Sequence, residues 1–258
     1  MVHVIPKSGC ANTYIIEEDD GLIAVDVGSI GAAQELETYC TGVLKRPLQD
    51  IRFIIATHFH IDHIGGIGTL LKECSPETRV PFDIHAKGYI EERESLAPMK
   101  NWLSGLVPTI RENYTRIGNL SHIAFESLAG VPLPVFKDNG RLPYTDQVSY
   151  IDMQGALLGR IGFSDWEAVP TPGHTPDSIS LYNEKTQELI CGDLILGRHD
   201  GMGYLNRFCW DEGIVRDCFA VLKNVLSVRT IYPGHGEAIR DDVNAFAKVI
   251  PFEGKGGK

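Results

Sequence analysis

Four potential metal ligands stand within six residues, directly after a strand-like segment. Residues 52–57 are rich in β-branched and aromatic side chains and lead into His58-Phe59-His60-Ile61-Asp62-His63. Side chains two apart on a strand point to the same side, so His58 and His60 face the same way if the extended geometry persists. This spacing indicates that the four side chains converge on a metal ion or a pair of ions at the end of a strand.

Three further candidates follow other strand-like segments. His174 and His235 each end a Pro-Gly-His tripeptide, and Asp193 ends the tripeptide Cys191-Gly192-Asp193. Imidazole and carboxylate groups without a thiolate suit zinc, iron, manganese or cobalt. Seven ligands are too many for one tetrahedral ion, which takes three protein groups and a water when it is catalytic.

The seven candidates divide into two metal sites. We expect His58, His60 and His174 to bind one ion, and Asp62, His63 and His235 to bind the other, with Asp193 bridging them. Two ions about 3.5–4 Å apart with a bridging hydroxide provide a nucleophile at neutral pH and a clamp for the substrate oxygen. The sequence therefore predicts two divalent metal ions as cofactors, with zinc ahead of iron or manganese.

Strand and helix signals alternate along both ends of the chain, which predicts an α/β layered fold. A hairpin is expected from residues 12–16 and 22–26, and a helix from residues 30–45. Residues 211–226 predict an amphipathic helix with Ile214, Cys218, Val221, Leu222 and Val225 on its apolar face. Residues 240–249 predict a last helix. Strands are expected at residues 166–169, 178–182, 188–191 and 230–232.

The middle of the chain differs from both ends. We expect one domain over residues 1–258, with an insertion at about 86–150 that holds a helix over 99–117 and a loop-rich stretch over 119–150. Trp102, Leu106 and Val107 on one side of that helix need a cover. The insertion is therefore expected to form either a lid over the metal site or a homodimer contact, and in both cases to favour a small substrate.

Composition limits the partners. The chain of 258 residues has 34 acidic and 24 basic side chains, a net charge of −10, so it repels phosphate backbones and no nucleic acid partner is expected. No signal peptide is seen, and the longest apolar runs fall far short of the ~20 residues of a membrane helix, so no membrane partner is expected. Six scattered cysteines without a CxxC pair indicate reduced thiols and a cytoplasmic location.

Taken together, these segments resemble the metallo-β-lactamase superfamily. The resemblance rests on the HxHxDH motif, the PGHT, GD and PGHG segments, and Asp26-Val27-Gly28, and it covers residues 12–75 and 162–240. It implies an αββα sandwich with the metal site at one edge of two facing sheets. It also implies the division of ligands given above, and a supporting role for Asp26 beside the ligands.

Departures from branches of the superfamily narrow the expected reaction. Zinc β-lactamases of the commonest class have a thiol where this chain has Asp193, and flavodiiron proteins have a glutamate where His60 stands. Glyoxalase II enzymes add a C-terminal helical domain, for which too few residues follow His235. Acyl-homoserine lactonases commonly have a tyrosine soon after the bridging aspartate, whereas residues 194–196 here are Leu-Ile-Leu, which leaves lactonase activity open but unsupported.

The sequence thus predicts a metallo-hydrolase that acts on a small ester, thioester or lactone, with phosphoesters still open. Asp62 is the candidate catalytic residue, because it could orient the hydroxide and carry a proton to the leaving group. Tyr204, Asn206 and Arg207, in a glycine-rich loop, are candidate substrate contacts. Three alternatives stay open: a mononuclear-iron enzyme similar to persulfide dioxygenases, a phosphodiesterase or nuclease, and a non-catalytic protein that keeps the metals and binds a ligand.

Overall fold

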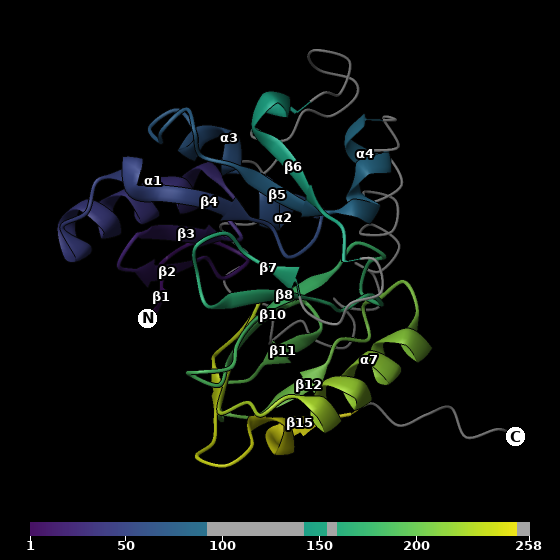
Figure 1. Ribbon diagram of the computed structural model, residues 1–258. Helices are drawn as coiled ribbons and strands as arrows, with labels where there is room; N and C mark the ends of the chain where they lie inside the picture. The colour runs from purple at the N-terminus through teal and green to yellow at the C-terminus, as the bar shows by residue number, and fades with distance from the viewer. Residues whose placement is uncertain (92–141, 154–158, 252–258) are drawn as a thin grey trace, which may run out of the picture.

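Two β-sheets face each other in the computed structural model, which describes residues 1–91, 142–153 and 159–251 (Figure 1). The first sheet has the strand order β1-β2-β3-β4. Its strands are β1 (Val2–Val4), β2 (Tyr14–Glu18), β3 (Gly21–Val25) and β4 (Ile51–Ile55). Strands β2 and β3 form the predicted antiparallel hairpin, and β4 runs parallel to β3. Strands β3 and β4 therefore end at the same edge.

The second sheet has the strand order β14-β13-β10-β9-β8-β7. Its strands are β7 (Gly159–Arg160), β8 (Trp166–Pro170), β9 (Ile179–Asn183), β10 (Glu188–Gly192), β13 (Thr230–Pro233) and β14 (Ile239–Arg240). Strand β9 is antiparallel to both β8 and β10, and β13 is parallel to β10. Strands β8, β10 and β13 consequently run in one direction and also end at a shared edge.

Helices cover the outer faces of the two sheets (Figure 1). Helix α1 (Ile30–Tyr39) packs on the first sheet and α7 (Glu212–Val225) on the second. The other helices of the described residues are the short α2 (Ile61–Ile64), α3 (Ile67–Leu70) and α4 (Lys87–Glu91). Helix α1 begins where the hydroxyl of Ser29 accepts a hydrogen bond from the backbone N–H of Ala32, and it continues as a π-helical turn over Cys40–Leu44. This agrees with the predicted helix over 30–45.

Alternation along β2 shows how the layers are filled. Ile15 packs in the cluster that lies between the first sheet and α1, whereas Tyr14 and Ile16 pack in the cluster between the two sheets. Trp166, fully buried, enters that same central cluster from the second sheet. A third cluster lies between the second sheet and α7. Helix, sheet, sheet and helix follow one another, so the predicted αββα sandwich is confirmed.

The apolar face predicted for α7 was wrong by part of a turn. Val215, Phe219 and Leu222 are the buried residues of this helix, whereas Val221 and Val225 are 47% and 54% exposed. Residues 215, 219 and 222 follow the i, i+4, i+7 spacing of one helical face, and all three pack in the cluster beside the second sheet. Of the other three predicted residues, only Leu222 is buried.

Short elements complete the described structure. They are β5 (Val80–Asp83), β6 (Val148–Ile151), β11 (Ile195–Gly197), β12 (Gly203–Leu205), β15 (Val249–Ile250) and the 3-10 turns Leu48–Asp50, Ile84–Ala86, Thr145–Gln147 and Ala245–Lys248. The helix predicted over 240–249 was wrong: the chain turns at residues 241–243, where Asp241 accepts hydrogen bonds from the backbone N–H groups of Val243 and Asn244.

The predicted insertion is only partly described. A loop was predicted up to residue 150, but residues 148–151 form strand β6, which pairs in parallel with β5. The predicted helix over 99–117, with Trp102, Leu106 and Val107, lies outside the described residues. Within the described ranges, no helix combines the length and the apolar character that a membrane crossing requires.

Candidate functional site

Five strands deliver side chains to one edge of the sandwich. Asp26 follows β3, and the 58–63 motif follows β4 in the first sheet. His174 follows β8, Asp193 follows β10, and His235 follows β13 in the second sheet. Because β3 and β4 are parallel, and β8, β10 and β13 share one direction, their carboxyl ends gather these side chains at one place. All seven predicted ligand residues meet there.

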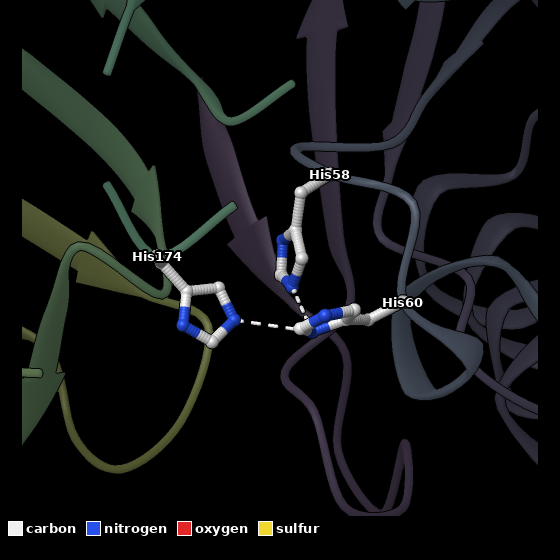
Figure 2. A group of neighbouring side chains, drawn as sticks. All are labelled: His58, His60 and His174. Carbon is white, nitrogen blue, oxygen red and sulfur yellow. Dashed lines mark hydrogen bonds between the residues drawn. The ribbon is translucent and has the colours of Figure 1, made fainter. Parts of the chain in front are cut away.

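Three imidazoles form one half of the cluster, shown in Figure 2. His58 Nε2 lies 2.9 Å from His60 Nδ1, and His174 Nε2 lies 3.1 Å from the same atom. All three side chains are buried. His58 and His60 come from the loop after β4, whereas His174 reaches across from the other sheet. One nitrogen of each ring therefore faces a common point.

Two carboxylates and two further imidazoles form the other half. His235 Nε2 lies 3.4 Å from both Asp62 Oδ2 and Asp193 Oδ2. His63 Nε2 lies 3.5 Å from Asp193 Oδ1 and 4.0 Å from Asp62 Oδ2. Asp193 Oδ2 is also 3.5 Å from His174 Nε2 in the first half. Asp193 thus stands between the two halves, where a bridging residue was predicted.

Protein oxygens hold the outer nitrogens of four rings. The Nδ1 atoms of His174 and His235 bond to the backbone carbonyls of Phe208 and Cys10, the latter at 2.9 Å. The Nδ1 of His63 lies 3.0 Å from Asp26 Oδ2, and that of His58 lies 3.1 Å from the hydroxyl of Thr57. Where the outer nitrogen donates its proton to such an oxygen, the inner nitrogen is left with a free lone pair. In its neutral form, a ring held in this way presents a lone pair to the centre and can bind a cation there.

Asp26 links the ends of β3 and β4 to the cluster. Its carboxylate is completely buried and accepts hydrogen bonds from the backbone N–H of Thr57, at 2.7 Å, and from the Thr57 hydroxyl, at 2.9 Å. Its backbone has a φ of 57°, which turns the chain sharply after β3. The carboxylate therefore fixes the end of β4 and also the ring of His63, which is the supporting place that the resemblance implied.

Two glycines allow the backbone to pass close to the cluster. A Cβ on Gly28 would lie 1.7 Å from the carbonyl oxygen of Asp62, and a Cβ on Gly234 would lie 2.2 Å from Asp193 Oδ1. Both separations are far below van der Waals contact. Only glycine fits at these two positions without a shift of the backbone or of the carboxylate.

The titrating groups affect one another strongly. Burial, with the neighbouring ring of His174, lowers the pKa of His60 to about 3. Burial acts to lower the pKa of His63 as well, but Asp26 and Asp193 outweigh it and raise this pKa to about 9. Burial alone would raise the pKa of Asp193, yet His235 and His63 hold it well below its usual range. The centre therefore favours ionised carboxylates and attracts positive charge.

Several buried polar atoms of the cluster have no hydrogen-bond partner among the described residues. They include His60 Nε2, Asp62 Oδ1 and Asp193 Oδ1. A buried polar atom without a partner costs about 1–3 kcal/mol, so an unexplained group of them calls for a missing partner. Two donor sets within the centre, His58–His60–His174 and His58–His63–Asp193, have geometry that could hold a metal ion. The donor atoms of Cys10, Asp62 and His235 form a third such set.

The predicted substrate contacts have different surroundings. Asn206 is buried, and its side chain accepts a hydrogen bond from the N–H of Phe208 and lies 3.3 Å from His174 Nδ1, so it supports the site instead of facing a substrate. Tyr204 is half-buried and Arg207 is exposed. Sequence reasoning missed Cys10 and Phe208, because no spacing links them to residues that far along the chain.

Fold and site together define an αββα sandwich protein with a buried cluster of histidine and aspartate side chains at one edge of its sheets. Comparison with known sequences agrees with this description. The sequence model described as the metallo-beta-lactamase superfamily matches residues 10–235. The chain belongs to this superfamily.

Individual relatives are distant. The beta-lactamase-like protein 2 homolog of Caenorhabditis elegans is 25% identical over 88% of this chain and 56% of its own length. The probable metallo-hydrolase YflN of Bacillus subtilis is 27% identical over 72% of this chain and 61% of its own length. This chain thus spans about six tenths of these curated relatives. Among solved structures, the BLEG-1 B3 metallo-beta-lactamase has a TM-score of 0.57 and 19% identity, covering 93% of this chain and 94% of its own.

Proposed function

We propose that this chain is a hydrolase that uses two divalent metal ions, zinc before iron or manganese, to cleave a small ester, thioester or lactone. His58, His60 and His174 would hold one ion. Asp62, His63 and His235 would hold the other, and Asp193 would bridge them. The name of the Bacillus subtilis relative, a probable metallo-hydrolase, agrees with this class. Because the chain spans only about six tenths of these relatives, its hydrolytic activity is proposed here from its own residues.

The orientation of the imidazoles carries the proposal. Nε2 of His63, His174 and His235 points into the cluster, while the Nδ1 of each ring faces an oxygen of the protein. Histidines that bind metals are typically held in this way, because the outer contact fixes the tautomer and the angle of the ring. Buried histidines in an ordinary core have no need for a common point of convergence.

Charge supports two ions instead of one. Asp26, Asp62 and Asp193 place three carboxylates in a centre that is mostly buried. Buried charges must be compensated, since an isolated ion in a medium of low polarity is costly. With two divalent cations and one hydroxide, the three carboxylates give the centre a net charge of zero. A single divalent cation would leave it negative.

The ions, when bound, would supply a hydroxide nucleophile at neutral pH and a Lewis acid for the substrate oxygen. The residues of the chain would do the rest. Asp62 has one oxygen 3.4 Å from His235 and a second, Oδ1, without a hydrogen-bond partner in the described structure. That free oxygen suits a carboxylate that takes a proton and passes it to a leaving group. Five of the seven cluster residues are buried, whereas Asp62 and His235 are partly exposed and give the centre its access to solvent.

Elemental analysis and a substrate panel test the proposal together. Purified protein should contain close to two metal ions per chain after supplementation, and it should hydrolyse at least one member of an ester, thioester and lactone panel. A content that stays near one ion would contradict the binuclear centre. Hydrolysis of phosphodiesters alone, or oxygen uptake with a persulfide, would contradict the substrate class.

Two histidine variants provide a matched comparison. His174→Ala removes a buried ring of the cluster, whereas His199→Ala removes an exposed ring whose Nδ1 pairs with Glu237. The first variant should lose metal and hydrolysis, and the second should keep both. If both variants retain two ions and full activity, the cluster is not the metal site.

A further inference from the structure

Cys10 lies near the candidate metal centre and precedes strand β2, whereas the predicted ligands follow the ends of their strands. It lies in the loop between β1 and β2. Strand β2 is antiparallel to β3, so the start of β2 lies at the same edge as the end of β3. The loop that precedes Tyr14 therefore enters the edge where Asp26 and the 58–63 motif are found.

The loop is fastened to the segment that carries His235. The side-chain amide of Asn12 donates to the carbonyls of Pro233 and Gly236, at 2.9 and 2.8 Å, and its backbone N–H donates to Gly234 at 2.7 Å. The carbonyl of Cys10 accepts from His235 Nδ1 at 2.9 Å. These four bonds hold the Cys10 backbone beside the cluster.

The thiol is close enough to join the donors. Cys10 Sγ lies 4.0 Å from His235 Nδ1, and the ligand atoms of Cys10, Asp62 and His235 lie within 4.8 Å of one another. Donor atoms around one zinc ion, with bonds of about 2.0–2.3 Å, are separated by up to roughly 4 Å. The separations in this set, at most 4.8 Å, exceed that range by less than about 1 Å.

Unsatisfied carboxylate oxygens in the same centre call for a ligand. Asp193 is 7% exposed, and its Oδ1 has no hydrogen-bond partner among the described residues, as is also true of Asp62 Oδ1. The other oxygen of each carboxylate, Oδ2, lies 3.4 Å from His235 Nε2. The thiol of Cys10 therefore borders a part of the centre that holds two carboxylates, and a cation placed there would contact sulfur and oxygen together.

We propose that the thiolate of Cys10 is an additional ligand of the metal ion held by Asp62, His63 and His235. This inference rests on the proposed two-ion centre. Binding breaks the S–H bond and forms a bond from sulfur to the metal, and the proton leaves to solvent, since only the thiolate ligates. Thiolate is a soft ligand that suits zinc better than manganese, so Cys10 gives this ion position a preference for zinc.

X-ray absorption at the zinc edge tests the sulfur ligand directly. The protein loaded with two zinc ions should show a sulfur shell at about 2.3 Å, apart from the nitrogen and oxygen shell at about 2.0–2.2 Å. Cys10→Ser should remove the sulfur shell, while the shell of nitrogen and oxygen ligands remains. Cys74→Ser is the matched control, because that half-buried cysteine packs against the cluster behind the first sheet, and it should keep the sulfur shell.

Metal competition gives a second readout. In Cys10→Ser and Cys10→Ala, the affinity of one of the two positions for zinc should fall by at least about tenfold. The affinity of the same position for manganese should fall by less than its affinity for zinc. The preference of this position for zinc over manganese should therefore become smaller. Cobalt loading of the native chain should give a thiolate-to-cobalt charge-transfer band that both variants lack.

The possible results separate the two proposals. Two bound ions without a sulfur shell, or a sulfur shell that persists in Cys10→Ser, would overturn the role of Cys10 and leave the two-ion centre standing. A native chain that binds fewer than two ions would overturn the proposed function, and the role of Cys10 with it. Two ions, a sulfur shell in the native chain and its loss in both Cys10 variants would establish the additional ligand.

Discussion

The carboxylate of Asp177 accepts a 2.7 Å hydrogen bond from the backbone N–H of Phe59. Phe59 lies between His58 and His60, and Asp177 follows His174 by three residues. One buried side chain therefore ties the loop of the first sheet to the loop of the second, with all three histidines of Figure 2 on those loops. Asp177 thus positions these histidines without being one of the predicted ligands.

Replacement of Asp177 should change how stability depends on pH. Burial raises the pKa of Asp177 to about 6 from its ordinary 3.8, despite hydrogen bonds from Thr175 and Phe59 that act to lower it. The folded state therefore penalises the ionised form. This penalty is absent below about pH 4, grows as the pH rises and is complete above about pH 6.

Asp177→Asn keeps an oxygen for the N–H of Phe59 but carries no charge. Relative to the native chain, its free energy of unfolding should improve as the pH rises from 4 to 7, by roughly 3 kcal/mol at most. Urea unfolding of both metal-loaded proteins at a series of pH values measures this difference. Asp165→Asn, at an exposed carboxylate, should show no such trend. A constant difference for Asp177→Asn would show that its carboxyl does not titrate in this range.

Gly28→Ala should damage the centre although residue 28 has no functional group. The new methyl group would overlap the carbonyl oxygen of Asp62, and the backbone of α2 would have to move. Overpacking of this kind typically costs about 1–3 kcal/mol. The metal content and the Tm of thermal unfolding should both fall. Gly42→Ala is the control, because nothing lies within 4 Å of its Cβ position, and its stability should be unchanged or slightly higher.

Asp193→Ala should lower the metal content from two ions to about one and abolish hydrolysis. The carboxylate stands between the two halves of the cluster and would offset the repulsion between two cations. Elemental analysis and a substrate assay measure both effects, and circular dichroism should show a retained fold. Asp165→Ala should leave both properties unchanged. Two tightly held ions in Asp193→Ala would rule out its bridging role.

Removal of the metal should reduce stability in proportion to the affinity that is lost. A ligand at a thousand times its dissociation constant stabilises the folded state by about 4 kcal/mol. In a chain of this size that corresponds to a fall in Tm of about 10 °C after chelation. Added zinc should restore the Tm, and added magnesium should not. A Tm that does not respond to the chelator would contradict metal binding by the folded chain.

Local patterns in the sequence predicted most of the layered fold. The two apolar runs at residues 12–16 and 22–26 predicted the hairpin, and β-branched runs predicted the central strands, because neighbours along the chain determine those structures. Prediction failed where distant contacts decide. Residues 148–151 form a strand because β5 pairs with them, and the buried face of α7 depends on how Phe219 meets the second sheet.

The candidate site shows the same division. The seven clustered residues were found because motif chemistry marks them one by one in the sequence. The contact of Gly28 with Asp62 and that of Cys10 with His235 join segments that no periodicity relates. Such contacts follow from the docking of loops at the sheet edge, which becomes visible only once both sheets are in place.

The two sheets also determine when the site can exist. The first sheet supplies His58, His60, Asp62 and His63, and the second supplies His174, Asp193 and His235. During synthesis the first four residues leave the ribosome long before His235, the last of the seven. A nascent chain therefore cannot complete the centre until its second half has emerged and docked, and a metal ion captured earlier would find only half of its ligands.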